Sequence, residues 1–245
     1  MINKIYKRIH NKYSTLFKFI FFLRYLFGIF FIVFVLFLLI PNFFDYQKRD
    51  KIIKNYLLES YGLKLNKYEN IKFNSLPVPN LEIFNASLNF NTTSVRLDVQ
   101  NLNIYPKLVN IYNFKNFKAK KIVFSKNKIA LQTDELKILS KYIYKLENKF
   151  TLKNLEIKIF RDDEFLINLK NINLSNYGYN KNTIRGEVFN KKFKMKMDNN
   201  LNKLNFNLLN TGINVDLIFN KTKEDLPLNG IVKAKLLNSN LKFNF

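Results

Sequence analysis

The amino-acid sequence predicts a mainly β protein, in which an N-terminal transmembrane helix is followed by a strongly curved antiparallel sheet with one or two short helices. Three observations support this fold class. Residues 25–44 form one long uncharged apolar run, the chain beyond residue 63 repeatedly alternates apolar and polar residues, and short Asn-rich segments separate the alternating runs. Such alternation gives a strand one apolar and one polar face, and Asn suits the tight turns between strands.

The run at 25–44 has the length and composition of a membrane-spanning helix. Sixteen of its 20 residues are Leu, Ile, Val or Phe, and about 20 apolar residues suffice to cross a bilayer as a helix. A cleaved signal peptide would have a shorter apolar core and small residues at a cleavage site. Here the run passes Pro41 and Asn42 without an Ala-x-Ala pattern, so we predict an uncleaved anchor.

The flanks of the anchor predict its orientation. Residues 1–24 carry six basic residues and no acid, whereas residues 45–60 carry four basic residues interspersed with three acids. Because basic loops stay in the cytoplasm, residues 1–24 are predicted to be a cytoplasmic tail and residues 45–245 to lie outside the cytoplasm.

Residues 45–62 are predicted to form an amphipathic connector helix. Ile53, Leu57 and Tyr61 recur every four residues from Asp50 onward, which gives a helix one apolar side. Gly62 follows at the position where a glycine commonly ends a helix.

Residues 63–245 are predicted to form one extracytoplasmic β domain, because no Pro- or Ser-rich linker divides them. Two helices interrupt the roughly twelve strands that the alternation predicts. The first is a short one at 106–112, with Pro106 at its first position. The second runs from about 133 to 148 and presents Leu136, Leu139 and Ile143 on one face.

A curved sheet with few covering helices could leave its apolar face open as a trough; the alternative is a closed β-sandwich or jelly roll. We expect the following side chains to line an open trough: Ile129, Leu131, Phe193, Met195, Met197, Leu204, Phe206, Leu208, Ile213, Val215, Leu217 and Phe219.

The order of segments between residues 20 and 135 resembles the N-terminal region of the AsmA-like proteins. The anchor and short helix are followed by a Pro-x-Pro motif at Pro77 and Pro79 with alternating apolar residues to Leu88. An alternating strand, the Leu108-Val109 turn and a strand pair that includes Ile129-Ala130-Leu131 come next. Pro77 and Pro79 are the residues that match the family motif.

This resemblance implies a bacterial inner-membrane protein with a single span, a cytoplasmic N-terminus and a periplasmic β-groove. Members of the family are thought to act in phospholipid transport or outer-membrane assembly in Gram-negative cells, so membrane phospholipids are the implied partners. This chain is shorter than typical members. Twelve strands at about 4.8 Å would give a groove of roughly 55–60 Å, too short to bridge two membranes. An exposed C-terminal edge strand would suit pairing with other envelope β-groove proteins.

Two alternatives to a lipid-handling role stay open. One is an envelope assembly factor with a closed core and no ligand. The other is an LptC-like β-domain of lipopolysaccharide export.

Composition argues against an enzyme and against a resident cofactor or metal. The chain has no Cys and one His, His10, which leaves little for acid–base, thiol or metal chemistry. The one acidic cluster, Asp162–Glu164, falls where a turn is expected. The net charge of +23 comes mostly from Lys, and these residues are dispersed along strands rather than clustered in a nucleic-acid-binding module. We therefore expect no nucleic-acid partner.

Overall fold

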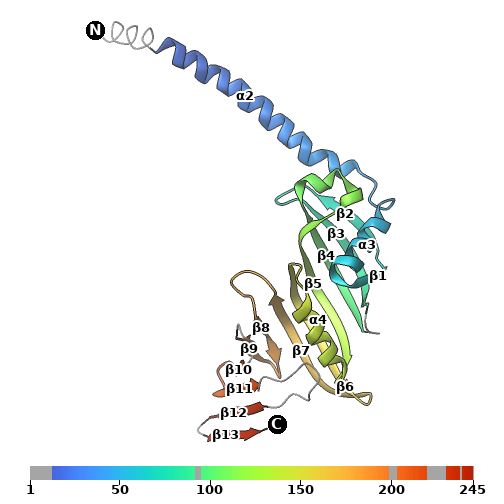
Figure 1. Cartoon of the computed structure of the whole chain (residues 1–245), viewed down its shortest axis with the longest axis vertical. Coiled ribbons are helices and arrows are strands. Elements are labelled where there is room, and N and C mark those ends of the chain that lie inside the picture. The colour runs from blue at the N-terminus through green and yellow to red at the C-terminus, as the bar shows by residue number, and fades with distance from the viewer. Residues whose placement is uncertain (1–12, 92–94, 199–202, 220–229, 238, 245) are drawn as a thin grey trace, which may run out of the picture.

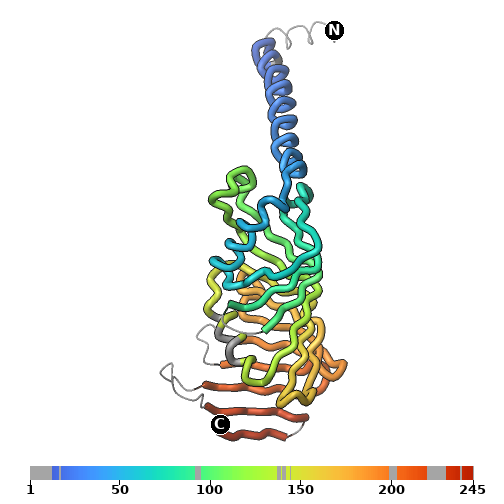
Figure 2. Tube along the Cα trace, turned by 90° about the vertical axis from the view of Figure 1, so that its right-hand side faces the viewer, coloured from blue at the N-terminus to red at the C-terminus, as the bar shows by residue number. Residues whose placement is uncertain are grey.

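The computed structural model describes residues 13–91, 95–198, 203–219, 230–237 and 239–244 (Figure 1). Residues 1–12 of the predicted tail, which include His10, and Phe245 lie outside these residues. The chain consists of a long N-terminal helix and one large sheet, with short helices on one face of the sheet (Figures 1 and 2).

The N-terminal helix α2 spans Ser14–Leu39 and continues into a 3-10 turn, η1, at Ile40–Phe43. The helical stretch is long and apolar enough to span a membrane. The predicted span of 25–44 lies almost wholly within α2 and η1. The helix begins earlier than predicted, at Ser14, and its first turns include Lys18 and Arg24.

The connector helix α3 spans Asp50–Tyr61 and confirms the predicted amphipathic helix. Ile53, Leu57 and Tyr61 are all buried, as their spacing indicates. Gly62 adopts a left-handed conformation (φ 58°), and its backbone N–H bonds to the carbonyls of Leu57 and Leu58. Glycine allows this helix end without the steric cost that a side chain would bring.

Thirteen strands form one sheet among the described residues, in the order β1-β3-β4-β5-β6-β7-β8-β9-β10-β11-β12-β13, and β2 also pairs with β3. Their bounds are β1 Leu63–Lys67, β2 Asn70–Asn74, β3 Asn80–Phe90, β4 Arg96–Pro106, β5 Ala119–Gln132, β6 Phe150–Arg161, β7 Glu164–Ser175, β8 Thr183–Val188, β9 Lys191–Met197, β10 Lys203–Leu208, β11 Ile213–Phe219, β12 Gly230–Leu236 and β13 Ser239–Asn244.

The sheet is open. Its two edges do not pair with each other among the described strands, and Figures 1 and 2 show the strands stacked away from α2 as one long twisted ribbon. The predicted open sheet is therefore observed, rather than the closed sandwich or jelly roll.

One pair departs from the predicted antiparallel arrangement: β5 and β6 are parallel. Helix α4, at Glu135–Lys145, lies between them in the chain. It carries the chain back along the sheet, so that β6 starts at the same end as β5. The α4 helix itself confirms the helix predicted at 133–148.

The short helix predicted at 106–112 is wrong in its start and type. Pro106 is the last residue of β4, and two 3-10 turns follow, η2 at Leu108–Ile111 and η3 at Phe114–Asn116. Proline fits here because it ends the strand ladder, for which it has no N–H.

A line of backbone kinks crosses the strands β3 to β7. Asn85, Lys126, Asn154 and Asn171 all have positive φ, between 48° and 55°. The strand registers place Lys126 opposite Asn154 and, across β4, in line with Asn85. Asn is one of the few residues other than glycine that tolerates this conformation, which explains its use at three of the four positions.

The kinks keep one face of each strand apolar along its whole length. In β5, Ile122 and Phe124 are buried before Lys126, whereas Ile129 and Leu131 are buried after it. The alternation therefore slips by one residue at the kink, and buried side chains on both sides of it join the same core. Beneath the kink, the buried Asn127 donates from Nδ2 to the carbonyl of Lys153 (3.1 Å).

The β domain caps the end of α2 with side chains. The Ser75 hydroxyl donates to the carbonyl of Leu38 (2.9 Å), the Tyr112 hydroxyl donates to that of Phe37, and Asn42 donates to that of Leu39 (3.1 Å). The last carbonyls of a helix have no partner within the helix. These contacts therefore fix the helix end to the loops beside it.

We predict that Gly62→Ala lowers the stability of the β domain by about 1–2 kcal/mol, because a Cβ is costly in the left-handed region. Thermal unfolding followed by circular dichroism would measure the loss. Gly28→Ala is the control, since an added Cβ there meets no atom within 4 Å. Equal melting temperatures for both variants would contradict the role given to Gly62.

We predict opposite effects for two substitutions in the line of kinks. Lys126→Gly should leave stability unchanged or raise it, because glycine adopts positive φ freely. Lys126→Ile should cost roughly 1–3 kcal/mol, because a β-branched residue is strained there. Chemical denaturation compares the two. Equal free energies of unfolding for Lys126→Ile and Lys126→Gly would show that the left-handed conformation at residue 126 does not constrain the sheet.

Candidate functional site

An apolar cavity of about 250 Å³ lies between α4 and the sheet. Strands β5 to β9 form its floor together with Leu63, Phe90 and Leu97 of β1, β3 and β4. Its roof is formed by Leu136, Leu139, Tyr142 and Ile143 of α4. Phe90 packs edge-on against Tyr142, with ring centroids 4.8 Å apart. Nearly every lining side chain is a hydrocarbon or an aromatic ring, so the cavity can accept an apolar group and offers few polar groups to orient a polar one.

Polar contacts at its C-terminal end hold α4 over the cavity. The Tyr142 hydroxyl donates to the carbonyl of Tyr61, and burial raises the pKa of that hydroxyl far above its usual value, so it stays a donor. After α4, Asn148 donates to the carbonyl of Ser60 (2.6 Å), and Asn176 donates to that of Leu146 (2.9 Å). The end of α3 and the end of β7 thus anchor the roof.

The apolar floor continues beyond the cavity across the last five strands. The registers place Met195, Phe206, Val215, Ala234 and Leu241 in one cross-strand row. A second row runs beside it through Met197, Leu204, Leu217, Val232 and Phe243. We call the side chains of this face of β9 to β13 the apolar trough: Phe193, Met195, Met197, Leu204, Phe206, Leu208, Ile213, Val215, Leu217, Phe219, Val232, Ala234, Leu241 and Phe243.

Burial is uneven across the trough. Phe193 is 3% exposed and stacks on Phe206, with ring centroids 5.5 Å apart. Phe206 and Leu208 are half-buried against the core, and Val232 on β12 is 8% exposed, whereas Leu241 and Phe243 on β13 are 48% and 53% exposed. Among the described residues, the outermost strand thus carries the exposed apolar side chains of the trough.

The sequence-predicted lining residues divide into three groups. Ile129, Phe193 and Met195 line the cavity. The other residues predicted on β9 to β11 lie in the trough, on the face that was predicted for them: Met197, Leu204, Phe206, Leu208, Ile213, Val215, Leu217 and Phe219. Leu131 is fully buried in the core and lies outside the cavity lining.

The motif prolines do not contribute to the trough. Pro77 and Pro79 lie in the loop between β2 and β3, at the end of the domain next to α2, and the Leu76–Pro77 peptide bond is cis. Their place is structural, at the junction with the helix.

A groove along the whole sheet, as expected from roughly twelve strands, is not present. The face beside α2 is filled by a core in which Tyr46 stacks on Phe73 (5.9 Å between centroids) and Phe114 stacks on Phe117 (5.3 Å). Among the described residues, the part of the apolar face that this core does not fill extends from the cavity to β13.

Gly186 is a site residue that the sequence pattern does not single out. It pairs with Phe193 on the neighbouring strand. A Cβ added to residue 186 would lie 2.9 Å from ring carbons of Phe193, which is too close for two carbon atoms. Glycine in a strand often marks such a close approach. The sequence signal for this close approach is a glycine inside the strand segment Thr183–Val188.

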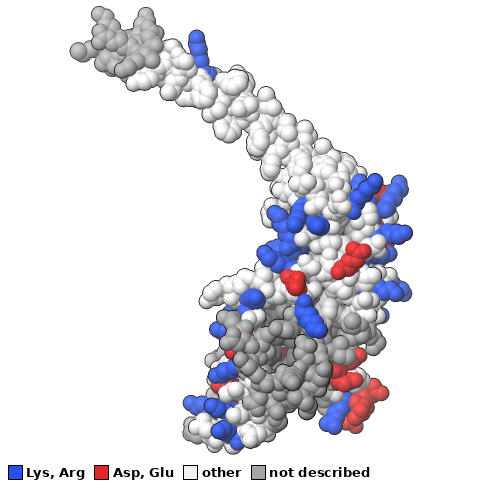
Figure 3. Space-filling model, in the orientation of Figure 1, with Lys and Arg blue, Asp and Glu red and all other residues white. Residues whose placement is uncertain are grey.

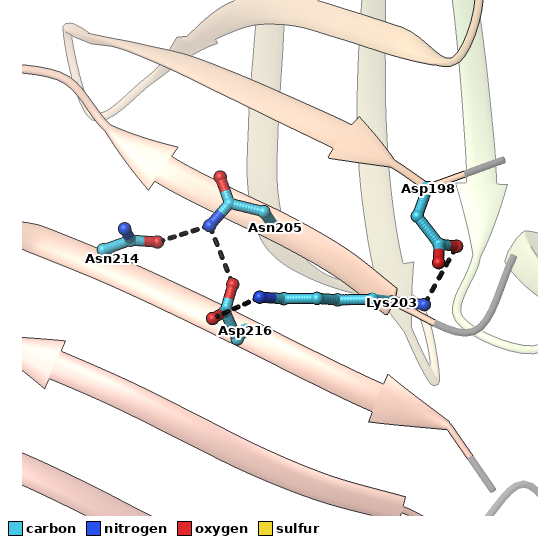
Figure 4. A network of polar contacts seen from close by, with 5 residues as sticks. All are labelled: Asp198, Lys203, Asn205, Asn214 and Asp216. Atoms are coloured by element: carbon cyan, nitrogen blue, oxygen red, sulfur yellow. Dashed lines mark hydrogen bonds and ion pairs between the residues drawn. The ribbon is translucent and has the colours of Figure 1, made fainter. Parts of the chain in front are cut away.

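The opposite face of the same strands is polar and basic. Figure 4 shows Asp216 of β11 accepting from Asn205 (2.8 Å) and pairing with Lys203 (2.9 Å), while Asn205 also donates to Asn214 (2.8 Å). Burial acts to raise the pKa of Asp216, but the hydrogen bonds from Asn205 and Lys203 outweigh it and hold that pKa below its usual value. The sheet thus has one hydrated face and one apolar face.

The acidic cluster forms a turn, as predicted. Asp162 and Asp163 have φ of 49° and 66° and join β6 to β7. In the described residues, no three His, Asp or Glu side chains are placed to hold a metal ion.

Comparison of the chain with models of protein families gave no match, and no curated protein is similar to it in sequence.

We predict that Gly186→Ala pushes the Phe193 ring out of its place and costs about 1–3 kcal/mol, as overpacking does. Thermal unfolding would measure this, and Phe193→Leu in the same chain should restore part of the loss by removing the ring. If Gly186→Ala alone is as stable as the parent, the close packing of Gly186 and Phe193 does not contribute to stability.

Proposed function

We propose that this chain is an AsmA-like protein, anchored in the bacterial inner membrane, that holds phospholipid acyl chains in the apolar trough during phospholipid transport or outer-membrane assembly. The observation that supports it best is the continuous apolar face from the cavity under α4 to β13. Stable monomeric proteins rarely leave a large contiguous apolar patch exposed, so such a face suggests a bound apolar partner.

The dimensions of the trough suit an acyl chain. Five strands, from β9 to β13, at about 4.8 Å spacing give a width of roughly 19 Å. A bilayer core of about 30 Å allots roughly 15 Å to the chains of one leaflet. Each methylene removed from water contributes about 0.8 kcal/mol, so an acyl chain lying across these strands would be held firmly.

The cavity alone is too small for this task. Its volume of about 250 Å³ lies below the ~300–1,000 Å³ of typical small-molecule sites. In the proposed arrangement the end of an acyl chain enters beneath α4, against Phe193 and Met195, and the rest lies across β10 to β13. The polar headgroup stays outside, in water.

The filled core next to α2 sets where lipid enters. Tyr46, Phe114 and Phe117 occupy the apolar face between the anchor and the cavity, so lipid does not travel inside the sheet from the anchor to the trough. Lipid reaches the trough from its open side or across the β13 edge.

The β13 edge offers a place for a protein partner. All six residues of Ser239–Asn244 are exposed, and β13 pairs only with β12 among the described strands. An exposed strand edge readily pairs with another chain. In the proposed assembly another envelope β-groove protein adds its sheet here, which would lengthen the trough.

The same free edge supports a second candidate, an envelope assembly factor that binds proteins through β13 and carries no ligand. The filled half of the sheet is consistent with either role. The two candidates differ in whether lipid contacts the trough.

A charge in the trough should abolish lipid contact. We predict that Phe206→Asp lowers crosslinking of a phospholipid with a photoreactive acyl chain by at least about tenfold in the membrane-bound full chain, because burying an unpaired carboxylate is costly. Mass spectrometry of the crosslinked protein measures it. The matched control is Asn207→Asp, which places the same charge one residue away, on the polar face.

Equal crosslinking of Phe206→Asp, Asn207→Asp and the parent would show that lipid does not enter the trough. Absence of any crosslink to the folded parent, together with co-purifying protein partners, would favour the ligand-free assembly factor.

A further inference from the structure

Exposed apolar side chains surround the end of α2. They are Phe43 at the end of η1, Leu76 and Val78 in the β2–β3 loop, and Leu108 and Val109 in η2; we call these five residues the collar. Their exposed fractions include 88% for Phe43, 70% for Leu76 and 81% for Val109. Figure 2 shows the two loops on opposite sides of the helix end.

Direct contacts set the level of the collar along α2. Ser75, next to Leu76, donates to the carbonyl of Leu38, and Tyr112, just after η2, donates to that of Phe37. The rings of Phe37 and Tyr112 also pack together, 4.8 Å between centroids. The collar loops thus sit beside residues 37–39 of the helix, inside its apolar stretch.

The length of α2 then places the collar at the membrane boundary. Its 26 residues make about 39 Å at 1.5 Å per residue, whereas the bilayer hydrocarbon is about 30 Å thick. Lys18 belongs at the headgroups of the far leaflet, and the long side chain of Arg24 reaches back toward them. Leu39, the last residue of α2, lies about 32 Å along the helix from Lys18 at 1.5 Å per residue. The end of α2 and the collar beside it therefore reach the near interface.

Basic and aromatic groups next to the collar fit this placement. Lys107 precedes η2 and Lys115 lies in η3, and both are exposed. Arg49 lies between the rings of Phe44 and Phe114, with its guanidinium carbon 4.4 and 4.3 Å from their centroids. Figure 3 shows Lys and Arg on the domain surface near the end of α2, which itself is white below its first turns. Tyr at the headgroup level and basic groups at phosphates are typical of membrane interfaces.

We propose that the collar inserts into the interface of the leaflet nearest to the β domain, so that the domain stands directly on the bilayer instead of on a free stalk. The partner is the lipid surface itself. Five apolar side chains leave water when the anchor is embedded, and the helix-capping contacts of Ser75 and Tyr112 keep the domain in one orientation. This inference rests on the membrane anchor of the proposed function and is independent of the lipid trough.

The chain has no Trp, so single Trp residues can report depth without background. The full chain is placed in vesicles of phosphatidylcholine and phosphatidylglycerol that carry bromine either near the headgroup or in mid-chain. Val78→Trp and Val109→Trp report on the collar, and Phe31→Trp, 66% exposed in α2, reports on the anchor. Phe165→Trp is the matched control, since Phe165 is 58% exposed beside the β6–β7 turn, at the end of the domain away from α2 (Figure 1).

We expect both collar reporters to have blue-shifted emission and to be quenched several-fold more strongly than Phe165→Trp, most by bromine near the headgroup. Phe31→Trp should be quenched most by bromine in mid-chain. Circular dichroism checks that each variant keeps the β domain folded.

Two results would overturn the proposal, and they are distinguishable. If Phe31→Trp is quenched while the collar reporters behave like Phe165→Trp, the anchor holds but the collar stays in water. If Phe31→Trp is itself unquenched, the membrane anchor fails and the collar proposal fails with it.

Discussion

An open sheet with one apolar face must have that face covered, and this requirement organises the whole molecule. Beside the anchor, α3 with η2 and η3 fills the face with a core that includes Tyr46 and Phe114. In the middle, α4 covers the sheet but leaves a cavity. At the far end no described element covers the face, and the apolar side chains range from buried Val232 on β12 to exposed Leu241 and Phe243 on β13. Among the described residues, the candidate site lies where this cover is partial.

The line of kinks makes that single face possible in long strands. Lys126 and the kink residues of the neighbouring strands each adopt a left-handed conformation. As a result, the alternation of buried and exposed side chains shifts by one residue after each kink. Such residues are costly in isolation and persist where the surrounding structure determines them. In β5 the slip brings Ile129 to the cavity and Leu131 to the core, on the face that also carries Phe124. The site thus depends on the backbone geometry of its own strands, since Leu155 and Ile172 of the cavity lining directly follow the kink residues Asn154 and Asn171.

The two ends of the domain have different surfaces. Next to α2, the capping contacts to Phe37 and Leu38 tie the loops to the helix, and exposed apolar side chains gather at that level. At the other end, β13 pairs only with β12 among the described strands and carries the exposed side chains of Leu241 and Phe243. Between them lies the filled core, which separates the membrane contact from the trough. Under the proposed function, attachment and lipid handling are therefore carried by different parts of one sheet.

The sequence by itself determined the features that depend on local pattern. These are the apolar run at 25–44, the bounds of α3 with its glycine end, and the shared face of the trough residues on β9 to β11, because periodicity and turn chemistry act over a few residues. Tertiary structure alone decided that β5 and β6 pair in parallel, that α4 roofs a cavity, and that Leu131 belongs to the core while Ile129 lines the site. It also placed Pro77 and Pro79 beside the anchor, away from the trough. These outcomes depend on contacts between residues far apart in the chain, and alternation specifies which face a residue takes without specifying what will cover that face.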